Sequence, residues 1–162
     1  MMNAKYFWTL AIITFLFSCI QEQEKGNEFN KQAVITEINK MFDNYHNDIK
    51  STGLTSEFKY LDNSDDFFWV PPGQNCALSY DSVKAILEKN AVAFRKIEFH
   101  WDTLQIFPLS AQIATYSGIV SGTMIDTSGV KSSVQIIESG TVIKRKDGWK
   151  LLSGQSATLT TN

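Results

Sequence analysis

Five side chains in this sequence could perform acid–base chemistry on a small molecule. Glu138, His100 and Asp102 each carry a carboxylate or an imidazole that could take a proton from a substrate. Tyr45 and Tyr116 carry hydroxyl groups that could hold the negative charge that then develops. Together they are candidates for a general base and its hydrogen-bonding partner, with no catalytic residue assigned among them.

Sequence position narrows these candidates only in part. Glu138 is the one charged residue in residues 136–140, so it could be a pocket acid, or a residue that faces solvent or an interface. His100 and Asp102 alternate with Phe99 and Trp101, and alternate residues of a strand point to opposite faces. His100 and Asp102 therefore cannot both join those aromatic rings in one pocket.

The sequence contains no pattern typical of a metal or cofactor site. The two histidines, His46 and His100, lie far apart and lack the acidic or cysteine spacing of a metal centre. There is no phosphate-binding loop, nucleophile elbow or dinucleotide fingerprint. We expect no metal and no cofactor.

Charge and cysteine content argue against nucleic-acid binding and against an internal disulfide. The net charge is −2, and the one basic cluster, Lys144 to Lys146, lies beside a turn, so nucleic-acid binding is not expected. If Cys19 is modified, Cys76 has no partner for an internal disulfide. Such a cysteine is either a small buried apolar residue or a reactive thiol, and the sequence favours the first.

The N-terminus has the pattern of an export signal. Lys5 precedes an apolar run over residues 7–17, which is too short to span a membrane. The following residues, Leu16 to Cys19, resemble the lipobox of bacterial lipoproteins. That resemblance implies cleavage before Cys19, attachment of a diacylglycerol to its thiol through a thioether, and attachment of an acyl chain such as palmitate to its amine. The alternative is ordinary cleavage near Ser18, with Cys19 incidental.

This pattern divides the chain into three parts. Residues 1–18 are predicted to be the signal peptide, residues 19–28 a lipidated flexible tether, and residues 29–159 the folded domain. Cleavage leaves 162 − 18 = 144 residues, the size of one domain. We expect a lipoprotein of the cell envelope, anchored to a membrane and facing the periplasm or the exterior.

Helical spacing dominates the first half of the domain. Apolar residues recur three and four positions apart from Ile35 to Ile49, which predicts one long helix that ends near Gly53. A short helical piece is expected over residues 56–61. A third helix should begin after a Ser79 cap, with Val83, Ile86, Leu87 and Phe94 on its buried face.

Strand signals dominate the second half. Residues 66–70 predict a short strand that ends at two prolines and Gly73. From Lys96 onward, turn residues separate four long stretches that favour antiparallel strands. The most specific signal is Asp147-Gly148, expected to be the two residues of a tight hairpin turn, both with positive φ. Apolar residues on both strand faces predict that each face of the sheet is covered.

The order of these elements resembles the nuclear transport factor 2-like superfamily, in particular its SnoaL-like branch. The resemblance rests on residues 65–73, 79–87 and 144–152 and extends from about residue 29 to residue 156. It implies an α+β fold in which N-terminal helices pack on a curved antiparallel sheet to form a cone. It also implies a pocket at the open end of the cone and a homodimer formed through the outer sheet face.

Aromatic residues are the expected walls of that implied pocket, unless they only form the core. The candidates are Phe42, Tyr45, Phe68, Trp69, Trp101 and Tyr116. Such a lining suits a small hydrophobic or planar ligand. The leading interpretation is a lipoprotein that binds a small apolar molecule without established catalysis. The alternatives are an isomerase, dehydratase or hydrolase that uses an acid or histidine base, and a non-catalytic dimerisation module.

Overall fold

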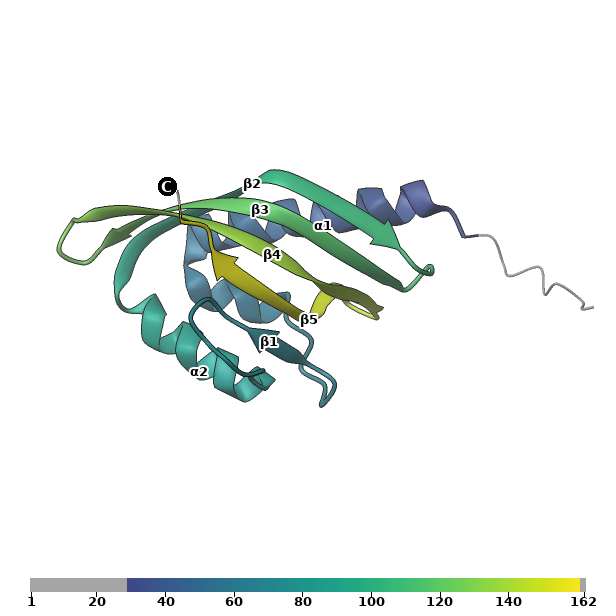
Figure 1. Ribbon diagram of the computed structural model, residues 1–162, viewed down its shortest axis with the longest axis horizontal. Helices are drawn as coiled ribbons and strands as arrows, with labels where there is room; N and C mark the ends of the chain where they lie inside the picture. The colour runs from purple at the N-terminus through teal and green to yellow at the C-terminus, as the bar shows by residue number, and fades with distance from the viewer. Residues whose placement is uncertain (1–28, 161–162) are drawn as a thin grey trace, which may run out of the picture.

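Two α-helices, one 3₁₀ helix and a five-stranded sheet make up residues 29–160, the part of the chain that the computed structural model describes (Figure 1). Cys19, the predicted signal peptide and the predicted tether lie outside these residues. The elements are α1 (Lys31–Thr52), η2 (Leu54–Lys59), β1 (Phe68–Val70), α2 (Tyr80–Ala91), β2 (Phe94–Pro108), β3 (Ile113–Asp126), β4 (Lys131–Arg145) and β5 (Gly148–Thr158). Within residues 29–160 no helix is both long and apolar enough to cross a membrane.

The long helix α1 forms as its periodicity predicts. Its N-terminus is capped by Asn30, whose side chain accepts a hydrogen bond from the backbone of Ala33 at 3.0 Å. It ends at Gly53, which has a φ of 91° that few other residues tolerate. Its buried face is apolar and packs on the sheet: Val34, Ile38, Met41, Phe42 and Ile49.

The two shorter helices differ from prediction at their ends. The predicted helix over residues 56–61 is instead η2, which stops at Lys59 because Leu61 pairs with the backbone beside Leu151. The Ser79 cap of α2 is confirmed, since its side chain accepts from the backbone of Ser82. Phe94 is not helical, because it pairs with Asp126 at the start of β2.

The sheet has the strand order β1-β5-β4-β3-β2 and is open and curved (Figure 1). Strands β2 to β5 form the predicted antiparallel meander. The edge strand β1 pairs with β5 in parallel, so the sheet is mixed and not wholly antiparallel as expected. The long stretch of chain between β1 and β5 permits this parallel pairing, which a tight hairpin turn would not.

The hairpin between β4 and β5 is present, with a different turn from the one predicted. Arg145 pairs with Gly148, so the two turn residues are Lys146 and Asp147. Gly148 has a φ of 122°, whereas no residue other than glycine among those described has positive φ. The glycine is therefore needed one position later than expected, at the first residue of β5.

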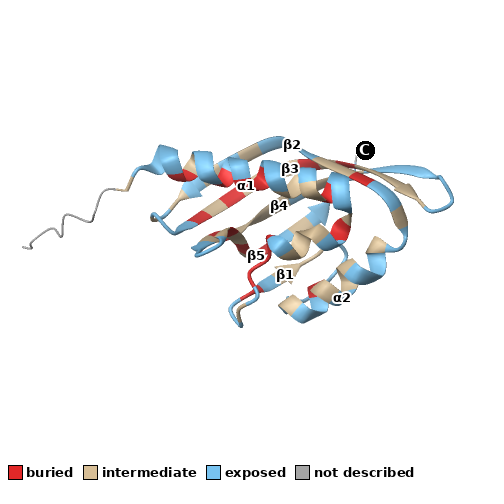
Figure 2. Cartoon of the chain, turned by 180° about the vertical axis from the view of Figure 1, so that it is seen from behind, coloured by how far each residue is buried: buried red, intermediate tan, exposed pale blue. Residues whose placement is uncertain are grey.

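Both helices and η2 lie on the inner, concave side of the sheet (Figure 2). Alternate residues of β3, including Ala114, Tyr116 and Val120, are buried beneath them. Gly118 lies in the same row, where a side chain would collide with the Trp101 ring at 2.8 Å. This glycine lets the Trp101 ring lie close against β3.

The outer face of the sheet combines polar residues with exposed apolar ones such as Phe68, Phe107 and Ile137. No element within residues 29–160 covers it. Cys76 lies in the loop between β1 and α2 and is exposed, so the expectation of a buried cysteine is wrong. Its loop is held only at its base, where Trp69 and Leu78 exchange backbone hydrogen bonds of 3.0 and 2.8 Å. Leu78 at the end of the loop packs against the core, whereas Cys76 stays exposed.

Candidate functional site

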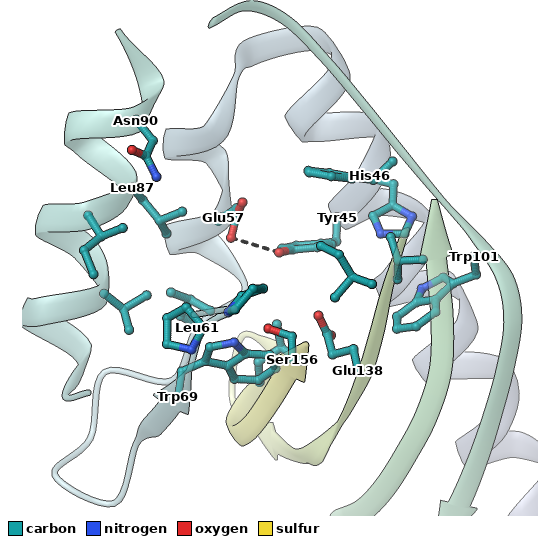
Figure 3. A pocket seen from close by; sticks show the side chains of 18 residues that line it. Tyr45, His46, Glu57, Leu61, Trp69, Leu87, Asn90, Trp101, Glu138 and Ser156 are labelled. Atoms are coloured by element: carbon teal, nitrogen blue, oxygen red, sulfur yellow. Dashed lines mark hydrogen bonds between the residues drawn. The ribbon is translucent and has the colours of Figure 1, made fainter. Parts of the chain in front are cut away.

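A cavity of about 210 Å³ lies between the helices and the inner face of the sheet (Figure 3). Eighteen residues line it, and most of them are apolar or aromatic. Residues from α1, η2, α2 and all five strands contribute, so the cavity exists only once the whole domain has folded. Two of the lining residues are carboxylic acids, Glu57 and Glu138.

Glu138 projects from the inner face of β4 into the cavity, directly opposite Ser156 on β5. The Tyr116 hydroxyl donates a hydrogen bond of 2.7 Å to its Oε1 atom. Burial raises the pKa of Glu138 to about 7, and the Tyr116 hydrogen bond only partly opposes that rise. Burial and the nearby Glu138 charge also raise the pKa of Tyr116 well above its ordinary value.

Glu57 approaches the same cavity from η2, on the opposite side from the sheet (Figure 3). The Tyr45 hydroxyl of α1 donates a hydrogen bond of 2.9 Å to its Oε2 atom. Burial raises the pKa of Glu57 to about 7; the Tyr45 hydrogen bond lowers it, and the negative charge of Glu138 raises it further. The two acids thus influence each other and titrate as a coupled pair.

Each acid keeps one oxygen free of protein partners. Glu57 uses Oε2 and Glu138 uses Oε1 for its tyrosine, and neither second oxygen has a hydrogen bond to any residue from 29 to 160. Neither of these oxygens is occluded, because among the described side chains only Trp101 Nε1 is both buried and unpartnered. The free oxygens are therefore available to a molecule in the cavity.

His46 lines the cavity one residue after Tyr45 on α1. Burial lowers the pKa of its imidazole to about 4; Asp43 opposes that shift and His100 adds to it. Its ring lies 5.9 Å from the Trp101 ring and 6.3 Å from the Phe99 ring, measured between centroids. Near neutral pH, His46 is an uncharged donor or acceptor within an aromatic wall.

The structure brings together four of the residues singled out from the sequence. Tyr45, Trp69, Trp101 and Glu138 all line the cavity (Figure 3). Phe42 and Tyr116 lie behind this wall in the core, where their rings pack edge to face at 4.8 Å. Tyr116 still takes part in the site through its hydroxyl group.

The remaining predicted site residues lie on the outer face of the sheet. Phe68 is 46% exposed there and does not line the cavity. His100 Nε2 lies 3.1 Å from Asp102 Oδ1, and Asp102 accepts hydrogen bonds from Ser121 and Gln135. As their alternation with aromatic residues implies, they point away from the cavity.

Sequence reasoning missed two ionisable members of the site. Glu57 lies in a short mixed stretch without periodicity, and His46 was considered only as a metal ligand. The one signal for Glu57 is a single acidic residue in a turn-like segment. That signal is weak, because most such residues face solvent. Among residues 29–160 no group of three or more histidine, cysteine or acidic side chains could hold a metal ion.

No protein-family model matches the sequence, and no curated protein sequence matches it. A nuclear transport factor 2-like superfamily protein from Salmonella enterica superposes with a TM-score of 0.69 and 14% identity, over 82% of this chain and 96% of its own.

Two further solved structures are similar. A candidate scytalone dehydratase from Novosphingobium aromaticivorans has a TM-score of 0.67 and 18% identity, over 81% of this chain and 87% of its own. A hexachlorocyclohexane dehydrochlorinase has a TM-score of 0.63 and 10% identity, over 80% and 87% of the two chains. At such low identity these similarities establish fold alone. The chain therefore has the fold of the nuclear transport factor 2-like superfamily.

Proposed function

We propose that this domain binds a small, mainly apolar molecule that carries one polar group. The observation that carries the proposal is the cavity, whose apolar and aromatic walls enclose two carboxyl groups with free oxygens. Apolar walls supply affinity, and a few convergent polar groups orient the ligand. The similar folds of a dehydrochlorinase and a candidate dehydratase, both named for small substrates, also support it.

The size of the cavity sets the size of the ligand. Its volume of about 210 Å³ exceeds that of the engineered cavity of roughly 150 Å³ that holds benzene in another protein. Two fused rings or one ring with a short substituent are suitable. Indan-2-ol, a fused ring system with one hydroxyl group, is therefore a fitting probe.

The test measures binding of indan-2-ol by calorimetry and by the shift in thermal unfolding. Ser156→Phe should abolish binding, because it places a ring in the cavity beside Glu138. Gln155→Phe is the matched control, since Gln155 is exposed and its side chain leaves the strand on the opposite face. The proposal is wrong if the wild type binds no indane derivative, or if both variants bind equally well.

Proton transfer to or from the ligand is a second candidate function, which the environment of Glu138 favours. A carboxyl group whose pKa is about 7 is well matched to accept or donate a proton near neutral pH. Its bond to Tyr116 holds it in place, and its free oxygen is available to the ligand. Glu138 would act as the base, and Glu57 would hold the polar group of the ligand.

Exchange of carbon-bound hydrogen in 2-indanone tests this second function. The wild-type protein in D₂O should accelerate deuterium uptake next to the carbonyl, as followed by proton NMR. Glu138→Gln should lower the rate by about 10²-fold or more, since a positioned base contributes that much. Exchange no faster than in buffer, with binding intact, would leave a binding protein without catalysis.

We further propose that the domain works at the cell envelope, attached through a lipid on Cys19. The supporting observation is the lipobox-like stretch that ends at Cys19, ten residues before the described domain begins. Cys19→Ser should move the protein from the detergent phase to the aqueous phase, because several acyl chains are needed for stable anchoring. Partitioning unchanged by the substitution would contradict a lipid anchor.

The outer sheet face is the proposed surface for a homodimer. Ile137 is 44% exposed at its centre and pairs with Ile119 on β3, so apolar surface is open to solvent. The protein released by Cys19→Ser should sediment with twice the mass of one chain. Ile137→Glu should reduce that mass to one chain, since a buried charge disfavours the interface. A wild-type mass of one chain would exclude the dimer.

A further inference from the structure

We propose that the polar group of the ligand is a protonated amine, so that the cavity selects a cation with a small apolar body. This inference rests on the proposed binding function and adds the charge of the ligand. It is carried by the two carboxyl groups with free oxygens, by the lack of positive charge around them, and by the aromatic walls.

The side chains that line the cavity carry no positive charge near neutral pH. Of the eighteen lining residues none is lysine or arginine, and the one histidine, His46, is uncharged near neutral pH. The groups that face Glu57 and Glu138 from α1 and β3 are the hydroxyls of Tyr45 and Tyr116. Helix α2 contributes apolar side chains and the neutral Asn90. A negative charge in this cavity therefore has no positive partner from the chain that lines it.

A positively charged ligand would relieve this imbalance of charge. A buried charge without a partner is unfavourable, and an ion of opposite sign restores part of the lost solvation. The buried carboxyl group of Asp62 does have such a partner, because Arg145 donates two hydrogen bonds to it at 3.0 and 2.7 Å. Glu57 and Glu138 lack an equivalent, and an ammonium group would supply it.

The aromatic walls of the cavity also favour a cation. Tyr45, Trp69, Phe99 and Trp101 all contribute rings to the cavity. Aromatic rings attract cations through the negative potential above and below the ring plane, and tryptophan does so best. An anionic ligand would meet repulsion from both the carboxylates and these rings, whereas a neutral hydroxyl would gain a hydrogen bond to a carboxylate but no attraction between opposite charges.

The test compares three ligands with one shape and different charge: 2-aminoindane, indan-2-ol and indane-2-carboxylate. At about pH 8, where the acids are mostly ionised, 2-aminoindane should bind at least about tenfold more tightly than indan-2-ol, and the carboxylate should not bind. At about pH 5.5 the affinity for 2-aminoindane should fall by roughly tenfold, because both acids become protonated. The affinity for indan-2-ol should change little.

A double variant separates charge from shape. Glu57→Gln with Glu138→Gln keeps the size of both side chains and leaves one acceptor oxygen on each. It should bind 2-aminoindane no better than indan-2-ol. If the wild type binds indan-2-ol as tightly as the amine, or keeps the amine preference in the double variant, the amine inference is wrong while the cavity proposal stands. If no indane compound binds, the cavity proposal itself fails.

Discussion

The folded protein should lose stability as the pH rises from about 4.5 to about 7, against the usual behaviour of carboxyl groups. Glu57 and Glu138 have pKa values raised from 4.5 to about 7 in the folded state. Over that range the folded state still holds protons that the unfolded state has released. The free energy of unfolding therefore falls with rising pH, by on the order of a few kcal/mol for each buried acid. It levels off above about pH 7.

His46 partly opposes this trend. Its pKa falls from 6.5 to about 4 on folding, so it adds stability as the pH rises between those values. The contribution of the two acids is isolated by subtracting the curve of a double variant, Glu57→Gln with Glu138→Gln. The amides do not ionise, and they can still accept the hydrogen bonds of Tyr45 and Tyr116.

Urea unfolding at a series of pH values measures the difference. Relative to the wild type, the double variant should become progressively more stable from about pH 4.5 to about pH 7. Glu88→Gln, a change at an exposed position on α2, should leave the wild-type curve unchanged in shape. Parallel curves for the wild type and the double variant would mean that the two acids are not held in a desolvated cavity.

Phe42→Ala should be among the most destabilising single substitutions in the domain. Phe42 is 1% exposed, and its ring packs edge to face on Trp101 at 5.1 Å and on Tyr116 at 4.8 Å. Truncation of a buried phenylalanine leaves a void and costs about 3–5 kcal/mol of unfolding free energy. The void should also loosen Trp101, which lines the cavity, and Tyr116, whose hydroxyl group holds Glu138.

Chemical unfolding at a fixed pH provides the measurement, with Phe107→Ala as the control. Phe107 is 51% exposed on β2, so the same truncation there should change the free energy of unfolding by less than about 1 kcal/mol. Equal losses from the two substitutions would contradict the packing of α1 on the inner face of the sheet.

Local spacing accounts for the elements that were predicted well. The buried positions of α1 recur three and four residues apart, and the meander of β2 to β5 follows turn residues that occur at fixed points in the chain. Ser79 caps α2 because a hydroxyl at that place satisfies a backbone N–H group whatever the rest of the fold does. These features depend on neighbours in sequence, which a single chain displays directly.

Pairing between distant segments accounts for what was missed. Leu61 ends η2 because it meets Leu151, ninety positions along the chain, and the pairing of β1 is made with β5, at the other end of the domain. Phe68 and Trp69 are adjacent, yet only Trp69 lines the cavity, because the register of β1 on β5 turns Phe68 outward. The sequence around one residue of such a contact contains no pattern that indicates the other residue.

By itself the sequence determined the order of helices and strands, because that order follows from the type and period of neighbouring residues. Its resemblance to a known family implied the class of fold and a pocket with aromatic walls. Only the tertiary structure decided which acids share that pocket. Glu57 and Glu138 come from η2 and β4, each meets a tyrosine from a third or fourth element, and their raised pKa values arise from burial that no single segment can create.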